Sequence, residues 1–271
     1  MKYGFYLVVF FLAAVPVYAQ HTEQVVNTEK AFAKYAADHN PQAAFLQFMD
    51  SSAVVFREGK ILRAREVWAN YTPAIALTWQ PAFAGISRSG ELGFTTGPWQ
   101  VRKTLQDTAL NVGSFATVWK KTTSGEWKFM VDLGVSYKKP QQPALEVIVI
   151  KNTGSLKKGQ MRDAMQIERV FLDELNTKGR KIFGSYLHPN CWLNVEGYPP
   201  VRSTKAAKHF NPGDQLTEKY IPAGGGISSA GDLAYIYGSA EVSGKTENYL
   251  RVWQNTGSGW KIVMMTGPFP K

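Results

Sequence analysis

The residues best suited to acid–base chemistry lie in the second half of the chain, where two histidines stand on either side of a glutamate. They are His188, Glu196 and His209. An imidazole titrates near neutral pH, so it can move a proton together with a nearby carboxylate. One hypothesis is a catalytic group made of these three side chains. The alternative places His188 at the start of a turn and His209 on a helix surface.

Asp132 is a further candidate for acid–base chemistry. It interrupts an otherwise apolar strand-like run, residues 129–133. A carboxylate in such a strand either faces a pocket or reaches water at the rim of the sheet. Because side chains alternate along a strand, Asp132 shares a face with Lys128, which favours solvent unless a bulge intervenes.

Neither a metal nor a cofactor is expected. The four histidines and the single cysteine lack the HExxH and CxxC spacings of zinc sites. One cysteine cannot form an intramolecular disulfide, and the strand-like run around Cys191 predicts a small buried side chain.

A long internal repeat allows each candidate to be compared with a counterpart. Residues 85–97 (GISRSGELGFTTG) reappear as residues 226–238 (GISSAGDLAYIYG), and Val118-Trp119 recurs as Val252-Trp253. The copies lie roughly 140 residues apart, far more than the roughly 20–50 residues of a solenoid repeat. The sequence therefore predicts two globular domains in tandem.

Positions at which the copies differ are the candidates for ligand contact. Arg251 replaces Thr117, and a buried arginine there needs an anionic partner, either Glu241 or a ligand carboxylate. Arg57 and Asp132 are replaced by Val195 and Met265. The side chains expected to line a ligand pocket are Arg57, Trp79, Trp99, Tyr237 and Arg251.

The patterns predict an α+β fold in each copy, with about three N-terminal helices packed on one face of a curved antiparallel sheet. In the first copy, helices are expected over residues 22–38, 42–49 and 63–71. Strands are expected over residues 53–56, 81–87, 92–101, 113–121 and 127–135. The second copy is expected to begin with a helix over residues 160–176.

The N-terminus resembles a secretory signal. Lys2 precedes an apolar run, and residues 17–19 (VYA) form a small-residue cleavage site. We therefore expect a signal peptide at 1–19 and an exported protein, periplasmic or secreted. The expected domains are 20–137 and 159–271, joined by a linker at 138–158 whose apolar residues 145–150 dock on one of the domains as a short strand.

The composition narrows the range of partners. A hydrophobic fraction of 44% is typical of a globular protein. The net charge of +10 could attract an acidic partner, but no nucleic-acid motif accompanies it. No nucleic acid and no stable membrane insertion are expected, whereas either a homodimer or an intramolecular pairing of the two domains is.

The order of elements resembles the cone-shaped fold of the nuclear transport factor 2-like superfamily, which includes ketosteroid isomerase and SnoaL-type cyclases. Residues 77–81 (LTWQP), 90–99 (GELGFTTGPW) and 127–134 (WKFMVDLG) are similar to an exported SnoaL-like branch of uncharacterised function. The resemblance puts the catalytic carboxylate of ketosteroid isomerase at Arg57 and Val195. An arginine stays protonated and cannot act as a base, so the isomerase mechanism is not expected.

Three functions remain open at this point. The chain binds a small apolar or amphipathic molecule in one or both cones, which we favour because the known catalytic positions are replaced. Alternatively it is an acid–base lyase, isomerase or hydrolase on such a molecule, or a scaffold whose open sheet faces make domain or subunit contacts. An apolar pocket with one or two polar groups would favour binding, and a filled pocket would favour the scaffold.

Overall fold

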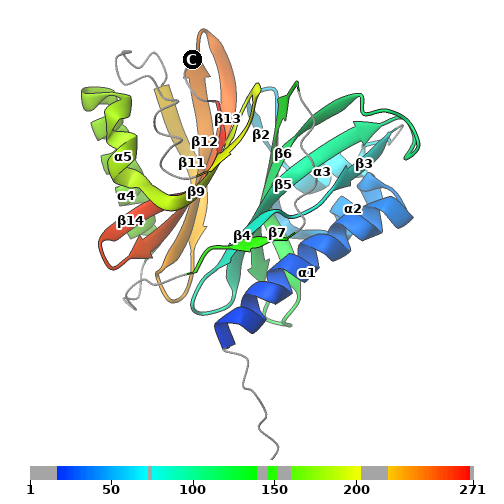
Figure 1. The fold of residues 1–271 in the computed structure, drawn as a ribbon, viewed down its shortest axis with the longest axis horizontal. Coiled ribbons are helices and arrows are strands. Elements are labelled where there is room, and N and C mark those ends of the chain that lie inside the picture. Colours follow the sequence, from blue (N-terminus) through cyan, green and yellow to red (C-terminus); the bar gives the residue numbers. More distant parts are fainter. Residues whose placement is uncertain (1–16, 73–74, 139–145, 152–159, 203–218, 269–271) are drawn as a thin grey trace, which may run out of the picture.

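Two sheets, each with helices on its outer side, make up the part of the chain that the structure describes (Figure 1). This computed structural model describes residues 17–72, 75–138, 146–151, 160–202 and 219–268, with side chains from residue 22 onward. Each sheet belongs to one copy of the repeat, so the chain is a tandem of two α+β domains, as expected.

Three helices open the first domain: α1 (Val17–Asp38), α2 (Pro41–Phe48) and α3 (Ala64–Ala69). Helix α1 buries Val25 and Phe32 against the sheet. The Asn40 side chain caps α2 by accepting the Ala43 N–H at 2.8 Å. Helix α1 begins ahead of the cleavage site expected after Ala19.

The first sheet has eight strands in the described residues, in the order β2-β1-β7-β6-β5-β4-β8, with β3 also paired to β5. Strands β1 and β7 are parallel, and the long strands β5, β6 and β7 are antiparallel. The strands are β1 (Met49–Arg57), β2 (Lys60–Arg63), β3 (Ala76–Trp79), β4 (Phe83–Ile86), β5 (Leu92–Arg102), β6 (Asn111–Lys121), β7 (Trp127–Tyr137) and β8 (Ile148–Val149).

Residues 148–150 of the expected linker pack on the first domain. Strand β8 runs parallel to β4, and Ile150 is buried in the core. The third expected helix is shorter than predicted, because Arg63 still pairs in β2 and α3 ends at its C-cap Asn70.

The second domain repeats this order with fewer strands. Its described helices are α4 (Met161–Lys178) and α5 (Phe183–Tyr186), and a third helix expected around His209 lies outside the described residues. The sheet order is β10-β9-β14-β13-β12-β11, again with one parallel pair, β9 and β14. The strands are β9 (Leu187–Val195), β10 (Tyr198–Arg202), β11 (Lys219–Ile227), β12 (Leu233–Val242), β13 (Lys245–Thr256) and β14 (Gly259–Gly267).

The final glycine of the repeated motif has a steric role in both domains. A Cβ on Gly97 would lie 2.0 Å from the Gln80 carbonyl oxygen, and one on Gly238 would lie 2.1 Å from that of Ile221. In both domains the neighbouring backbone lies too close for any side chain at this position. The repeat therefore conserves packing of the sheet.

A bulge in β7 decides which way Asp132 faces. Strand register moves from Trp119 opposite Phe129 to Val118 opposite Val131, so Met130 is the extra residue. An extra residue reverses the alternation of side chains beyond it. Asp132 and Lys128 therefore lie on opposite faces of the sheet. The prediction that Asp132 faces solvent, which assumed simple alternation, is wrong.

The faces of the two sheets that carry no helix pack on each other. Phe83 of the first domain stacks on Trp192 of the second, with ring centroids 5.6 Å apart. The shared core also holds Phe94, Val118, Val131, Leu133, Leu233, Leu250, Val252 and Met264. The two domains of this chain thus pair with each other.

The polar contacts across this interface are reciprocal. Glu91 accepts the Ser229 N–H at 2.5 Å, and its counterpart Asp232 accepts the Arg88 N–H at 2.7 Å. Arg88 and Ser229 are themselves equivalent positions of the repeat. Such exchange of equivalent contacts is the signature of a two-fold interface, here between two domains of one chain.

Candidate functional site

A cavity of about 220 Å³ lies between the helices and the sheet of the first domain. Nine of its described lining residues present apolar side chains or none: Phe32, Phe45, Trp68, Leu77, Trp79, Trp99, Val101, Phe115 and Gly134. The tenth is Asp132. The cavity is therefore an aromatic chamber with one carboxyl group.

Asp132 is held at the wall of this cavity by the neighbouring strand. It lies opposite Thr117 on β6, whose hydroxyl donates to its Oδ2 at 2.9 Å. Burial raises the pKa of Asp132 from 3.8 to about 7; the Thr117 hydrogen bond opposes this rise and the charge of Glu29 adds to it. Its carboxyl group can thus exchange a proton near neutral pH.

A second carboxylate, Glu29, lies fully buried behind the cavity wall. Its Oε1 accepts the indole N–H of Trp79 at 2.5 Å, and its Oε2 accepts the Thr95 hydroxyl at 2.5 Å and the Trp119 indole at 2.9 Å. Burial raises the pKa of Glu29, although these hydrogen bonds lower it. Glu29 connects α1 to three strands and adds negative potential beside Asp132.

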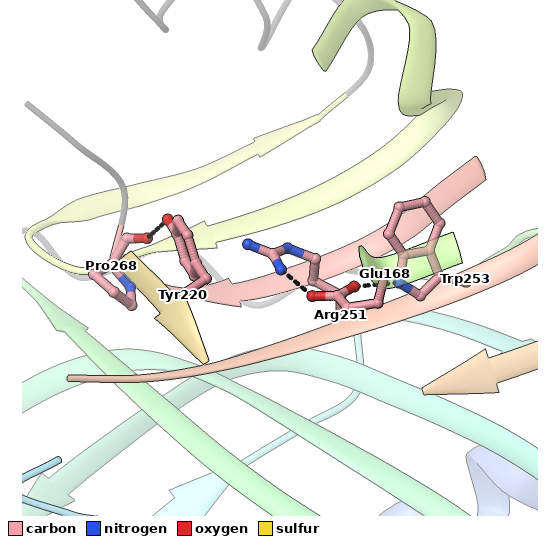
Figure 2. Close-up of polar contacts among 5 residues, drawn as sticks. All are labelled: Glu168, Tyr220, Arg251, Trp253 and Pro268. Carbon is pink, nitrogen blue, oxygen red and sulfur yellow. Dashed lines mark hydrogen bonds and ion pairs between the residues drawn. The ribbon is translucent and has the colours of Figure 1, made fainter. Parts of the chain in front are cut away.

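The second domain has a different arrangement at the same place. Glu168, the counterpart of Glu29, accepts the Trp253 indole at 2.9 Å and also a hydrogen bond from Nη1 of Arg251 (Figure 2). Both members of this ion pair are fully buried. The anionic partner of Arg251 is therefore Glu168, and the expectation of Glu241 or a ligand carboxylate is wrong.

Aromatic rings surround the Arg251 guanidinium. Its Cζ lies 4.3 Å from the ring centroid of Tyr249, 4.5 Å from that of Tyr220 and 4.9 Å from that of Phe171. Its Nε and Nη2 atoms have no hydrogen-bond acceptor within the described part of the chain. The cation is thus held by one carboxylate and by ring faces.

The structure brings together three of the predicted site residues. Asp132, Trp79 and Trp99 line the same cavity. The strand register supports the counterparts proposed from the repeat, since Trp79 pairs with Trp99 as Tyr220 pairs with Ala240. These three residues are therefore retained in the candidate site.

Two predicted pocket residues lie elsewhere. Arg57 is exposed, with its guanidinium 5.9 Å from the Trp68 ring and 5.6 Å from the Tyr71 ring. Tyr237 faces the domain interface, where its ring meets that of Phe56 at 5.8 Å. Its side chain points away from the core of its own domain because neighbouring residues of β12 alternate between the two faces.

The expected acid–base group of the second domain does not assemble. His188 lies at the start of β9 and Glu196 just beyond its end, roughly 25 Å apart at the rise of an extended strand. Glu196 accepts the N–H of Ser136 from the first domain at 3.0 Å. Nδ1 of His188 accepts the Asn190 N–H at 3.1 Å, which fits the turn alternative, and His209 lies outside the described residues.

The two buried glutamates, Glu29 and Glu168, were not among the predicted site residues, although their positions in the sequence indicate burial. Glu29 falls on the apolar stripe of its helix, four residues after Val25 and three before Phe32. Glu168 falls on the same stripe, four residues after Ala164 and three before Phe171. A carboxylate on the buried face of a helix needs partners, and its recurrence in both copies marks a shared site.

Among the described residues, no three His, Cys, Asp or Glu side chains gather closely enough to hold a metal ion. No helix in that part of the chain has the length and apolar character needed to cross a membrane.

No protein-family profile and no curated protein sequence matches this chain. Solved structures similar to it include an NTF2-like protein from Cytophaga hutchinsonii, at 18% identity over 40% of this chain and 98% of that one, with a TM-score of 0.34. An NTF2-like protein of unknown function from Shewanella oneidensis has 17% identity, coverages of 41% and 97%, and a TM-score of 0.34.

A third structure is an NTF2-like superfamily protein from Salmonella enterica, at 13% identity, with coverages of 45% and 94% and a TM-score of 0.35. At these identities no activity carries over to this chain. Each of these three matches covers less than half of this chain.

Proposed function

We propose that the first domain binds a small amphipathic molecule in the cavity around Asp132. One observation carries this proposal: a cavity of about 220 Å³ has aromatic walls and a single carboxyl group among its described lining residues. Ligand sites are typically apolar clefts with a few polar groups that orient the ligand. Further polar contacts are available, because the buried indole N–H groups of Trp68 and Trp99 have no acceptor in the described part of the chain.

The volume limits the size of the ligand. A protein cavity of about 150 Å³ holds benzene, so a cavity of about 220 Å³ suits one substituted ring or two fused rings. Pockets that hold drug-sized ligands typically have volumes of at least about 300 Å³. We therefore propose a ligand smaller than a steroid.

Thermal shift with a panel of small aromatic alcohols, acids and amines tests the proposal, together with quenching of tryptophan fluorescence. In the blocking variant Gly134→Leu, a side chain enters the cavity, since a Cβ there already approaches Trp99 Nε1 at 3.4 Å. The matched control Gly184→Leu adds the same side chain where nothing lies within 4 Å. We expect stabilisation of the wild type and the control but not of Gly134→Leu. No stabilisation of the wild type by any compound would refute binding.

Acid–base catalysis is the second candidate, and the Asp132 pKa of about 7 favours it. A carboxylate with this pKa can take a proton from a bound molecule and return it to another atom at neutral pH. Turnover of a bound compound that is lost in Asp132→Asn, while binding of the same compound persists, would distinguish catalysis from binding alone.

The second domain is proposed to act as the scaffold of this pair. Support comes from Arg251, which lies among the rings at the position corresponding to the first-domain cavity, and from the sheet face that packs on the first domain. In this proposal the second domain rigidifies the sheet that carries Asp132.

Export of the protein is also part of the proposal. The mature chain would begin at Gln20, which shortens α1 by its first residues and retains Glu29 and Phe32. The mass of the N-terminal peptide of the secreted protein tests this, and a cytoplasmic protein that retains Met1–Ala19 would contradict it.

A further inference from the structure

The rings that surround Arg251 in the second domain have counterparts in the cavity of the first. The strand registers and the repeat relate Phe171 to Phe32, Tyr220 to Trp79 and Tyr249 to Phe115. All three first-domain residues line the cavity. The guanidinium of Arg251 therefore occupies, in its own domain, the place that the cavity occupies in the first.

The acidic groups are also in place in the first domain, but the cation is absent from the described lining. Glu29 takes the position of Glu168, and Asp132 adds a second carboxyl group where the second domain has Met265. The arginine position is Thr117, and none of the described lining residues is basic. Two acids and a ring-lined space are thus left without a positive charge.

We propose that the first-domain cavity binds a small organic cation, an ammonium or guanidinium group on an apolar ring or chain, at the position that Arg251 holds in the second domain. This inference rests on the proposed function, and it names the class of ligand. The aromatic faces attract a cation, and its charge pairs with Asp132. A carboxylate ligand would be repelled by the same two acids.

The binding is coupled to the proton on Asp132. Within the described residues, the charged group that faces Asp132 is Glu29 of α1. The hydroxyl of Thr117 on β6 donates a hydrogen bond to Asp132. A bound cation favours the ionised carboxylate, so it displaces a proton when Asp132 is protonated. A neutral ligand of the same shape displaces none.

Isothermal titration of the full mature chain with benzylammonium, benzyl alcohol and benzoate tests this inference. We expect benzylammonium to bind at least about tenfold more tightly than benzyl alcohol, and benzoate more weakly than both. At pH 6, titrations in buffers of different ionisation enthalpy should show proton release with benzylammonium and none with benzyl alcohol.

Two variants separate the cation from the cavity. Asp132→Asn should weaken benzylammonium by about tenfold or more and leave benzyl alcohol within about threefold. Thr117→Arg places the guanidinium of the second domain into the first, and it should abolish binding of both compounds. If Thr117→Arg does not fold, Asp132→Asn still decides.

The outcomes distinguish this inference from the function on which it rests. Equal binding of benzylammonium and benzyl alcohol, or an equal loss of both in Asp132→Asn, would refute the preference for a cation. The proposed binding of a small molecule would still stand. If none of the three compounds, nor any compound of the thermal-shift panel, binds the wild type, the proposed function fails and the inference fails with it.

Discussion

The two domains share a frame and differ in what lies at its centre. Each has a glutamate on the buried face of its first helix, hydrogen bonded to a tryptophan indole in the sheet. In the second domain this glutamate pairs with Arg251, whose guanidinium lies among three aromatic rings. In the first, the corresponding rings line a cavity of about 220 Å³ with Asp132 at its wall.

The difference teaches that the side chain at one strand position, Thr117 or Arg251, can decide whether the space between helices and sheet stays open or is filled. In the second domain an arginine, Arg251, stands at the position of Thr117. Its guanidinium supplies a positive charge, and its side chain fills space between the rings. Its burial is tolerated because Glu168 and the ring faces compensate for lost hydration. The domain without it keeps both the space and the unbalanced acids, so it is the domain where we look for a ligand.

The largest effect is expected from removing the built-in cation. Arg251→Met leaves Glu168 buried without its charged partner, which should lower the free energy of unfolding by about 3–5 kcal/mol. The double variant Arg251→Met with Glu168→Gln removes both charges and should recover most of that loss. Urea unfolding followed by tryptophan fluorescence measures both.

The corresponding change in the first domain provides the control. Thr117→Val removes the hydrogen bond to Asp132 and the interaction of the same hydroxyl with Glu29, and we expect a cost of about 1 kcal/mol. If Arg251→Met costs no more than Thr117→Val, the buried ion pair does not stabilise the second domain and the contrast between the domains fails.

The next effect is a dependence of stability on pH that belongs to the first domain. Because the pKa of Asp132 is raised to about 7 on folding, its proton favours the folded state. The stabilisation by this proton is complete below about pH 3.8 and is lost as the pH rises towards about 7. Relative to Asp132→Asn, the wild type should lose about 2–4 kcal/mol between pH 4 and pH 8.

Asp173→Asn, which changes an exposed carboxylate on α4, is the control for this experiment. Its unfolding free energy should follow that of the wild type across the same range. Parallel curves for the wild type and Asp132→Asn would show that Asp132 titrates as a solvated carboxylate and that it does not lie in an apolar wall.

The smallest effect concerns the reciprocal contacts between the domains. Burial raises the pKa of Glu91, but hydrogen bonds that include those from Ser89 and Ser229 outweigh it, so the pKa is lowered from its usual value. The ionised Glu91 carboxylate therefore stabilises the folded state above about pH 4.5, and this stabilisation is lost as the pH falls further. We expect Glu91→Gln to cost about 1 kcal/mol at pH 7 and less at pH 4.

Asp232→Asn sharpens this result, because Asp232 accepts the Arg88 N–H in the equivalent position. A pseudo-two-fold interface predicts a cost of similar size for both variants. A loss confined to one of them would show that the two hairpins do not contribute equally, in contrast to their geometry.

Much of the fold could be predicted from the sequence because it depends on patterns that recur. The period of the repeat and the strands expected at residues 92–101, 113–121 and 127–135 follow from local composition, and the strands are present in the structure as β5, β6 and β7. The candidate site was predicted in part: Asp132, Trp79 and Trp99 lie together. His188 and Glu196 do not, since residues close in sequence are far apart along an extended strand.

The amino-acid sequence by itself determined that two copies of one α+β domain stand in tandem and which positions differ between them. Hydrophobic periodicity and turn residues act locally, so they can be interpreted along the chain. Tertiary structure alone decided the rest. A single bulged residue, Met130, turns Asp132 into the cavity. Glu168 and Arg251 become partners only because helix α4 packs on strand β13. Such contacts join residues far apart in the chain, and no local pattern specifies them.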